Sequence, residues 1–466
     1  MLLLLLQAPV VPRKRVVVSW DVGYVDIDRT GYGIVQGIGS NGVLPIPPVI
    51  LTVGDTLALT VRNLLNLTTL IHAHGLFQRG TSYMDGAAMA TQCGIPPGLQ
   101  FTYDGFGLIN GVNGKLTKPM HFQPSRTYRL RLVNMSAAIW FQFSLSGHVL
   151  RVVEINGEYT EPLEVGGVEI ASAQRYSVLL TAHSTNSFNY RYNITMYASF
   201  NPAEPGISPR IFIGDIIYQQ DAPFIQADAY DNSFRWAKDI ELHALAQEPA
   251  LSVGRSLELT IGRGVYSTDQ NLDHFNNITY ALPLTPALYT ALSMGNMAMD
   301  ERVCGPQAHV IVLMHNEVIE LVIHNPESLP HPLHSHGHAF QITEYGPTKP
   351  FVPNNVTAVP VVKHSGVSAK RDTVVVLPYQ YVKLRFRADN PGVWMLHCHM
   401  DIHFVICLAL AFIEAPGVLQ KTQKVLSEML ELCAKQGIKT TGNAAGNQGL
   451  NFTGLPSMPT IVLRKA

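Results

Sequence analysis

Short apolar runs, rich in β-branched and aromatic residues, recur along the chain and are separated by glycine, proline, asparagine and aspartate. Runs of this length, bounded by turn-forming residues, predict β-strands rather than helices. The clearest strands are expected at Ile50–Val53, Thr56–Val61, Tyr128–Val133, Leu150–Ile155, Ser177–Thr181, Val310–Met314 and Val382–Phe386. Their spacing predicts an all-β protein built from sandwiches or barrels, without βαβ units.

Helical periodicity is scarce in the sequence. Leu419–Lys435 has apolar residues at helical spacing, and we expect a helix there. The polar, proline-containing stretch from about Gln219 to about Ala250 predicts a linker between two domains. At 466 residues the chain has room for about three domains of ordinary size.

The composition limits the classes of function. Only 14% of the residues are charged and 47% are hydrophobic, which suits β-rich domains with large buried areas. The formal net charge of -1 provides no basic surface for nucleic acid. The apolar run Val405–Ile413 is far shorter than the ~20 residues of a membrane-spanning helix. We therefore expect a soluble chain without a transmembrane anchor.

The N-terminal segment and the glycosylation sequons indicate the secretory pathway. Met1–Leu6 is apolar like the core of a signal peptide, but basic residues follow it instead of preceding it, so we expect an incomplete signal. Six Asn-x-Ser/Thr sequons add support: Asn66, Asn134, Asn193, Asn277, Asn355 and Asn451. The sequence thus predicts an extracellular or cell-surface protein.

The densest group of metal-ligand residues lies in the run Val393–His403. If His397, Cys398 and His399 lie on a strand, both histidines face one side and the cysteine faces the other. A thiolate with two imidazoles is the ligand set of a blue-copper site, and His403 is near enough to turn back towards the cysteine. One face would then hold a single copper and the other a second metal cluster. The alternative is a buried free cysteine among core histidines.

Two further histidine groups help to decide between these alternatives. The motif HPLHSHGH spans His331–His338, and HAH spans His72–His74. Half of the 18 histidines fall into these three groups. A random distribution would not gather them in this way, so the pattern favours metal binding over a purely structural role.

The motifs HPLHSHGHAF, RFRADNPGVWMLHCHMDIH and HAHGLFQRGTSYMDG resemble the copper-binding signatures of the multicopper oxidases, the superfamily of laccases and ferroxidases. The resemblance extends from about Asp55 to about Gly446. It implies three cupredoxin-like domains: residues 1–104, residues 105–245 with the linker, and residues 246–466 with a type 1 copper site. It also implies copper as cofactor, four ions in the complete family site, and dioxygen as electron acceptor.

Carried over onto this sequence, the family motifs imply three kinds of copper ligand. The implied ligands are His331, Cys398 and His403 for type 1 copper, His72 and His334 for type 2 copper, and His74, His336, His397 and His399 for the type 3 pair. His338 matches a position that is not a ligand. In similar proteins the positions of Cys93 and Cys433 form a disulfide, whereas Cys304 and Cys407 have no expected partner.

One family motif is missing. An HSH group is expected shortly after Phe101–Asp104, but the chain continues directly into GFGLING, which resembles the start of the second domain. The first domain is therefore expected to be truncated, and each type 3 copper would lose one of its three histidines. The isolated histidines His121, His148 and His183 are expected to be surface or core residues rather than replacements.

The reductant is expected to be Fe(II). Fe(II) prefers carboxylate oxygens, and Glu327 lies four residues before His331, where the iron-uptake ferroxidases of fungi place an acid. Glu154 resembles another acid of that pocket, whereas laccases commonly have a carboxylate at the position of Asn156. An iron permease is the implied partner if the chain serves iron uptake. Laccase-type oxidation of phenols or aromatic amines is the alternative, and both glutamates are then ordinary surface acids.

Two more acids and a different class of function complete the expectations. Asp85 and Asp401 match family positions near the oxygen site, where they would hydrogen-bond copper-bound water and relay protons; otherwise each caps a turn. Without the HSH group, the chain is alternatively a copper-binding paralogue, or the product of an incomplete gene model, that does not reduce dioxygen.

Overall fold

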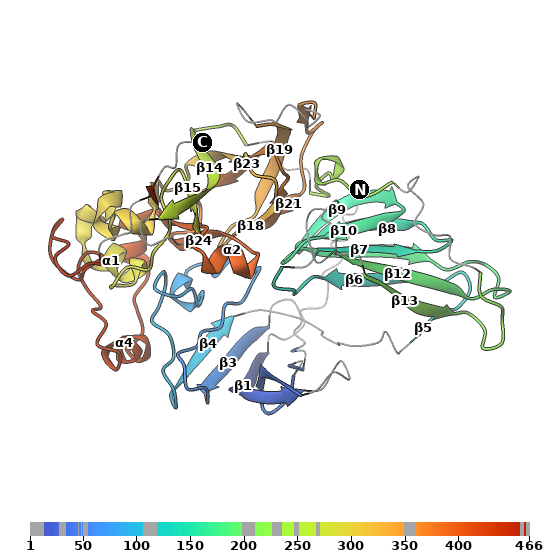
Figure 1. Cartoon of the computed structure of the whole chain (residues 1–466), viewed down its shortest axis with the longest axis horizontal. Coiled ribbons are helices and arrows are strands. Elements are labelled where there is room, and N and C mark those ends of the chain that lie inside the picture. The colour runs from blue at the N-terminus through green and yellow to red at the C-terminus, as the bar shows by residue number, and fades with distance from the viewer. Residues whose placement is uncertain are drawn as a thin grey trace, which may run out of the picture.

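The computed structural model describes residues 14–27, 34–44, 46–47, 49, 55–105, 119–138, 140–197, 210–225, 235–246, 251–266, 271–348, 359–456 and 461–462. Within these residues β-strands predominate and helices are few and short, which confirms the all-β prediction. The strands form three groups, which Figure 1 shows as three bodies. We call them the first unit (residues 14–105), the second unit (119–246) and the third unit (251–462).

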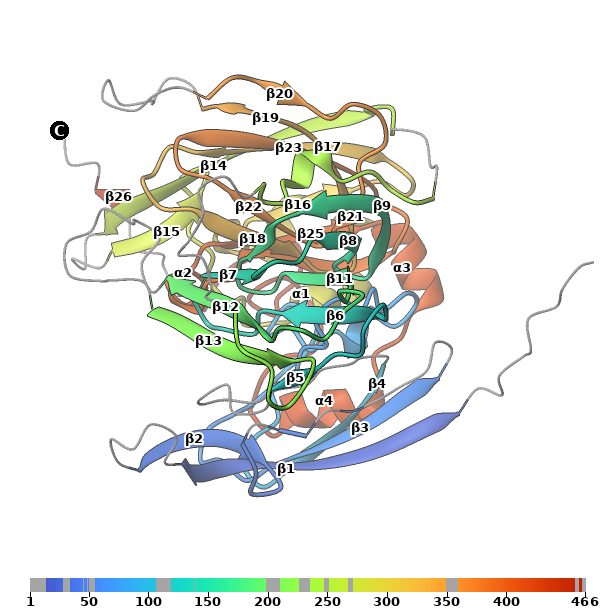
Figure 2. The same ribbon diagram turned by 90° about the vertical axis from the view of Figure 1, so that its right-hand side faces the viewer.

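The first unit holds a single sheet. Its strands, in spatial order, are β2 (Val35–Ser40), β1 (Arg15–Ile27), β3 (Thr56–Asn63) and β4 (Gln100–Gly105). Alternate residues of β3 and β4 point to one face of the sheet, where they pack against Met429 and Leu432 of the distant helix α4 (Ser427–Ala434). Figure 2 shows α4 lying along this sheet. A single sheet, covered by a helix from the far end of the chain, agrees with the truncated first domain that the sequence predicts.

The second unit is a sandwich of two sheets. The first sheet contains β10 (Gly167–Ile170), β7 (Trp140–Leu145), β12 (Tyr190–Tyr197), β13 (Arg210–Ile217) and β5 (Met120–His121). The second contains β6 (Thr127–Val133), β11 (Arg175–Thr181), β8 (Leu150–Ile155) and β9 (Glu158–Val165). Leu145 and Ile216 from one sheet share a buried core with Val152 and Val178 from the other, so the two apolar faces pack against each other.

The third unit is a larger sandwich. One sheet contains β15 (Asn271–Phe275), β14 (Arg255–Tyr266), β17 (Val318–Asn325), β23 (Gln380–Arg387), β19 (Phe340–Pro347) and β20 (Val362–Lys363), with β21 (Lys370–Arg371) and β26 (Ile461–Val462) at its margins. The other contains β16 (Val310–Leu313), β25 (Ala409–Glu414), β24 (Gly392–Cys398), β18 (His331–Ser335) and β22 (Thr373–Val376). Because β18 and β24 are neighbours, His334 lies directly opposite His397.

Helices fill the gaps between the sheets. The α-helices besides α4 are α1 (Ala287–Ser293), α2 (Asp401–Val405) and α3 (Pro416–Thr422). The 3-10 helices are η1 (Ser82–Met84), η2 (Asp239–Glu241), η3 (Gly295–Met299), η4 (Glu301–Cys304) and η5 (Pro306–Ala308). None of the described helices is long and apolar enough to span a bilayer.

The structure confirms six of the predicted strands to within two residues at each end. The seventh, Ile50–Val53, lies outside the described residues, as does the segment interpreted as an incomplete signal. The predicted helix Leu419–Lys435 is wrong in extent, because it is two helices, α3 and α4, separated by residues 423–426, which begin with the extended residue Gln423. The side chain of Gln423 accepts hydrogen bonds from the backbone and hydroxyl of Ser82, so a tertiary contact overrides the helical periodicity at this point.

The structure describes parts of the predicted linker and several of the sequons. The described parts of the stretch 219–250 include η2. In the same stretch Trp236 forms an isolated β-bridge with Gly167 of the second unit, and His243 forms one with Ser368 of the third unit. The domain boundaries themselves stay a prediction. Among the sequons, Asn134 is buried, and its amide donates a hydrogen bond of 2.8 Å to the Ile170 carbonyl, so this side chain is not accessible to a glycan in the folded protein.

Cys93 and Cys433 form a disulfide with Cα atoms 5.3 Å apart, as the family resemblance implies. The disulfide ties the first unit to α4 and closes a loop with a sequence separation of 340 residues. Because the cross-link restricts the unfolded chain, its reduction should lower the free energy of unfolding by about 2–5 kcal/mol. Denaturant titrations with and without reductant would measure this change. The double variant Cys93→Ser with Cys433→Ser should have the lower stability and no response to reductant; equal stability of all forms would contradict the prediction.

Candidate metal centres

The first candidate centre is formed by one cysteine and two histidines of the third unit. Cys398 ends β24, His331 begins β18, and His403 lies in α2, directly after β24. The Cys398 Sγ lies 3.7 Å from His331 Nδ1 and 3.5 Å from His403 Nδ1, and these two nitrogens are 3.0 Å apart. All three side chains are buried. Three possible ligand atoms therefore converge in a water-excluding pocket.

The surroundings of this centre favour a metal over free side chains. Burial raises the pKa of the Cys398 thiol and lowers the pKa of His403 to about 3, so a thiolate is stable here only with a cation that replaces its proton. The Glu327 carboxylate lies 3.2 Å from His331 Nε2, which leaves Nδ1 free for a metal and fixes the ring. The fully buried Leu408 belongs to the same apolar cluster as Cys398 and offers no ligand atom.

The end of β24 connects this centre to a second one. Cys398 faces the first centre, whereas the neighbouring residues face the opposite side, as strand alternation predicts. The Nε2 atom of His397 lies 3.2 Å from Nε2 of His336, and the ring of His399 lies 5.0 Å from the ring of His74. The cysteine and its two neighbours therefore form a short covalent path between the centres.

The second candidate centre is a cluster of histidines from the first and third units. Its members are His72, His74, His334, His336, His397 and His399. Four buried ring nitrogens have no hydrogen-bond partner within the described structure: His72 Nε2, His74 Nδ1, His334 Nε2 and His399 Nδ1. Unpaired buried polar atoms are costly and need an explanation. Ligand atoms of His72, His334 and His336 lie within 4.8 Å of one another, so metal ions are the explanation that fits.

Asp85 supports one side of the histidine cluster. Its Oδ2 lies 2.7 Å from His336 Nδ1, and its carbonyl oxygen lies 2.7 Å from His72 Nδ1. Burial acts to raise the pKa of the Asp85 carboxyl, but the two histidines outweigh burial and hold this pKa well below its usual range. The carboxylate therefore stays ionised and accepts the Nδ1–H of His336, which directs Nε2 of that ring towards the cluster.

Asp372 supports the other side of the cluster, and our sequence analysis missed it. Its carbonyl oxygen lies 2.9 Å from His334 Nδ1, and its carboxylate forms a bidentate ion pair with Arg175 of the second unit. Burial acts to raise the pKa of the Asp372 carboxyl, but Arg175 and His74 outweigh burial and lower this pKa strongly. The available signal was an Arg-Asp pair directly before the apolar run Val374–Leu377.

Two predicted acids are placed differently from Asp85. Glu154, on β8, pairs with Arg129 and accepts a hydrogen bond of 2.5 Å from the Ser177 hydroxyl. Asp401 is exposed in the first turn of α2, where an acid favours the helix terminus. Within the described part of the chain, no histidine is hydrogen-bonded to Asp401, so its role as a proton relay stays a prediction.

His121, His148 and His183, which belong to none of the histidine motifs, lie away from the two candidate centres as surface or core residues. His121 is exposed and His148 is buried, as expected for surface or core residues. The rings of His148 and His183 are 4.5 Å apart. The two nitrogens of His148 bond to the Ser146 carbonyl and the Tyr218 hydroxyl. His148 is therefore a satisfied core residue. His338, expected not to be a ligand, bonds Glu414 at 2.6 Å.

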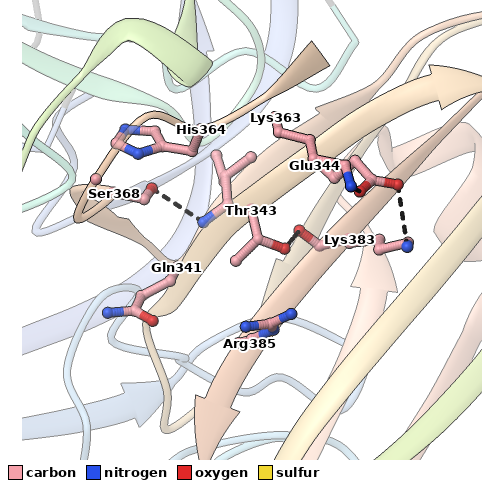
Figure 3. A pocket seen from close by; sticks show the side chains of 10 residues that line it. Gln341, Thr343, Glu344, Lys363, His364, Ser368, Lys383 and Arg385 are labelled. Atoms are coloured by element: carbon pink, nitrogen blue, oxygen red, sulfur yellow. Dashed lines mark hydrogen bonds and ion pairs between the residues drawn. The ribbon is translucent and has the colours of Figure 1, made fainter. Parts of the chain in front are cut away.

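A separate cavity of about 230 Å³ opens in the third unit beside β19 and β23. Figure 3 shows charged side chains around it. Both lysines pair with Glu344, Lys383 at 3.0 Å and Lys363 at 3.6 Å, and Arg385 pairs with Glu320. The lining contains His364 but no cysteine and no second histidine, so the cavity lacks the ligand pattern of the two histidine-containing centres.

Comparisons with known proteins agree with this geometry. Family models described as multicopper oxidase match residues 21–106, 83–208 and 280–418. The iron multicopper oxidase fer1 of Mycosarcoma maydis is 31% identical over 554 residues, which covers 95% of this chain and 87% of that protein. The chain belongs to the multicopper oxidase family. Because the alignment with fer1 is longer than the 466 residues of this multicopper oxidase, that relative carries segments that are absent here.

Another relative and two solved structures extend the comparison. The iron transport multicopper oxidase fio1 of Schizosaccharomyces pombe is 28% identical, covering 97% of this chain and 84% of fio1. The crystal structure of Fet3p, a multicopper oxidase that functions in iron import, matches with a TM-score of 0.87 and 25% identity over 96% of this chain and 100% of that one. A laccase from Botrytis aclada matches with a TM-score of 0.71 and 21% identity, covering 92% and 93% of the two chains, which shows the shared cupredoxin fold.

This multicopper oxidase is a copper-dependent oxidoreductase, and its donor atoms fit copper. A thiolate with two imidazoles selects copper at the first centre, and imidazoles without thiolate suit the copper ions of the second. The unpaired ring nitrogens of the second centre are the atoms that such ions would satisfy. The residues present therefore fit the cofactor that the family uses.

Proposed function

We propose that this multicopper oxidase takes electrons from Fe(II) at a type 1 copper and, when its histidine cluster is complete, passes them to dioxygen, which is reduced to water. His331, Cys398 and His403 would hold the type 1 copper, and the histidine cluster would hold the remaining copper. Bound copper supplies the one-electron chemistry, which the protein residues arrange in space. The reaction oxidises four Fe(II) ions for each dioxygen molecule and consumes four protons.

The contact between Glu327 and His331 carries the assignment of the reductant. Glu327 is partly exposed, while its Oε2 lies 3.2 Å from Nε2 of the buried His331. Burial acts to raise the pKa of Glu327, but His331 outweighs burial and lowers it. An ionised carboxylate that reaches both solvent and a type 1 ligand suits Fe(II), a cation that prefers oxygen ligands. From iron bound at Glu327, the electron would reach the type 1 copper across one hydrogen bond and the imidazole of His331.

The second predicted iron ligand has less support than the first. Glu154 is engaged by Arg129 and Ser177, and the guanidinium opposes binding of a cation at this carboxylate. The position where laccases commonly have a carboxylate offers no support for a phenol site either. Asn156 is buried and bonds Asp372 and the backbone of Arg175, so its amide is not available to a substrate.

The protein residues would also direct electrons and protons to the oxygen site. Cys398 is bonded through the backbone to His397 and His399, which face the histidine cluster. Asp85 Oδ1 is buried and has no hydrogen-bond partner in the described structure, so this oxygen can accept a hydrogen bond from water at the cluster. The ionised Asp85 is therefore the residue that we propose accepts hydrogen bonds from water at the cluster and orients that water during dioxygen reduction.

Removing the Glu327 carboxylate should slow electron entry from Fe(II) more than from a phenol. We expect Glu327→Gln to lower the rate constant for type 1 reduction by Fe(II) about tenfold, the effect of ~1.4 kcal/mol. The rate constant with a bulky aromatic amine should change little, because such a substrate needs no oxygen ligand. Anaerobic stopped-flow reduction of the blue copper measures both rates without requiring turnover of dioxygen.

Glu154→Gln is the matched comparison for this experiment. Because Glu154 is already neutralised by Arg129, its loss should affect Fe(II) less than the loss of Glu327. Equal losses for Fe(II) and the aromatic amine in Glu327→Gln would count against a ferroxidase and favour laccase-type oxidation.

The same proposal extends to the cellular setting. Several relatives are named as iron transport multicopper oxidases. We propose, from this likeness alone, that the protein acts outside the cell or at its surface and supplies Fe(III) to an iron permease. Co-purification of the full-length protein with a permease from the same organism would test this partner.

A further inference from the structure

We propose that Asp372, delivered together with Arg175, is the positioning residue for His74 and His334, and that the second unit is thereby a structural part of the oxygen site. The proposal rests on the copper assignment made above, but not on the identity of the reductant. It concerns two residues that the family motifs in the sequence do not mark.

Contacts around Asp372 join all three units at one point. Its carboxylate lies 2.7 and 2.6 Å from the two terminal nitrogens of Arg175 on β11. The guanidinium in turn lies 2.9 Å from His74 Nε2 of the first unit. The Asp372 carbonyl accepts from His334 Nδ1 in the third unit at 2.9 Å. Asp372 therefore acts on a histidine of each of two units: its backbone carbonyl holds His334 of the third unit, and its ion pair with Arg175 holds His74 of the first.

The orientation of the rings indicates that Asp372 is an anchor and not a ligand. It faces Nε2 of His74 and Nδ1 of His334, whereas the unpaired nitrogens are Nδ1 of His74 and Nε2 of His334. The atoms left free for copper thus point away from the carboxylate. In this structure Nε2 of His74 accepts from Arg175 at 2.9 Å. When Nδ1 binds a metal, Nε2 carries the proton and must donate to Asp372 Oδ1 instead, now 3.7 Å away.

The arrangement mirrors the one at Asp85. Asp85 holds Nδ1 of both His72 and His336. Asp372 holds the two neighbouring histidines of the same motifs, His74 and His334. Each aspartate thus orients one histidine through its backbone carbonyl, His72 or His334, and one on its carboxylate side, His336 or His74, so that metal-binding atoms converge between them.

Gly75 provides independent evidence that the fold accommodates the close approach of Arg175 to the turn after His74. Its φ of +80° is a conformation that side chains other than glycine rarely adopt. A Cβ atom at this position would lie 2.7 Å from Arg175 Nη2 and 3.4 Å from Asp372 Oδ2. The turn after His74 therefore admits the ion pair only because residue 75 has no side chain.

The main test removes the ion pair without leaving an unpaired buried charge. The variant Asp372→Asn with Arg175→Gln is loaded with Cu(II) in competition with a chelator, and type 2 copper is followed by electron paramagnetic resonance. We expect the copper affinity of the cluster to fall about 10- to 100-fold, the usual effect of lost support behind a ligand. The blue type 1 absorption per molecule should stay unchanged, because its ligands lie on the other side of β24.

A matched control uses another ion pair of the third unit. Glu320 and Arg385 are 2.8 Å apart and similarly shielded, so Glu320→Gln with Arg385→Gln should match the first variant in melting temperature but keep the cluster affinity. The proposal is overturned if both double variants bind copper equally, if the type 1 site is lost in parallel, or if the wild type binds no copper beyond type 1.

Gly75→Ala decides the question if the first double variant does not fold. This substitution keeps both charges and displaces them from His74, so the cluster affinity should again fall while the type 1 absorption remains. Unchanged affinity in Gly75→Ala would overturn the proposal. Failure of Fe(II) to reduce the blue copper would argue against the proposed reductant only, because the copper titrations do not depend on it.

Discussion

Copper-loaded wild-type protein is expected to show intense blue absorption from thiolate-to-copper charge transfer, and Cys398→Ser is expected to lose it completely. The sulfur of Cys398 is the only thiol at the candidate centre within the described residues. A hydroxyl is a poor ligand for this copper site and has no such transition. The same substitution should abolish electron entry from every reductant, because it removes the covalent path to His397 and His399.

Two further variants make this result specific. Leu408→Met places a thioether next to the site and should keep the blue colour, while the reduction potential falls, because a weak axial ligand tunes such sites. Glu327→Gln should also stay blue, since its carboxylate contacts the outer nitrogen of His331. Visible absorption and redox titration measure both effects. A wild-type protein that is colourless when loaded with copper would exclude the type 1 assignment.

Local patterns in the sequence predicted much of the fold and the direction of the ligands. Apolar runs bounded by turn residues located six of the described strands, because side-chain alternation is a property of consecutive residues. The same alternation predicted that Cys398 faces away from His397, as observed. The meeting of His74 with His399 depends instead on contacts between distant segments, and only the resemblance to known signatures indicated it.

Partners of charged residues were beyond local patterns. Glu154 was expected to be free for iron, but Arg129 lies on the neighbouring part of the same sheet and neutralises it. Asp372 and Arg175 are separated by 197 residues, and neither belongs to a histidine motif. The break between α3 and α4 likewise depends on Ser82, which is 341 residues away from Gln423. The contact of Glu154 with Arg129 forms only when the second unit folds, and the other two contacts form only when the units are packed together.

Dioxygen reduction by the chain as it stands is expected to be close to background, with fewer than four copper ions bound. Each type 3 copper would retain two histidines, His74 with His399 and His336 with His397, and the described structure brings both pairs together. Two imidazoles bind copper but leave one position without a protein ligand. Catalytic geometry must be held to about 0.5 Å, which an incomplete set of ligands does not achieve. Copper analysis and an oxygen electrode would measure both quantities.

Inserting the missing HSH-containing segment between Asp104 and Gly105 should restore four copper ions and rapid dioxygen uptake. The insertion point lies at the end of β4, an edge strand of its sheet, so added strands can complete the sandwich at the loss of a single existing pair, Gly105 with Leu57. The matched control carries the same segment with both histidines replaced by alanine; it should regain folding stability but not oxygen uptake. Recovery by the control would assign the defect to the lost packing rather than to the lost ligands. Robust four-electron turnover by the uninserted chain would overturn the prediction and would mean that other groups complete the cluster.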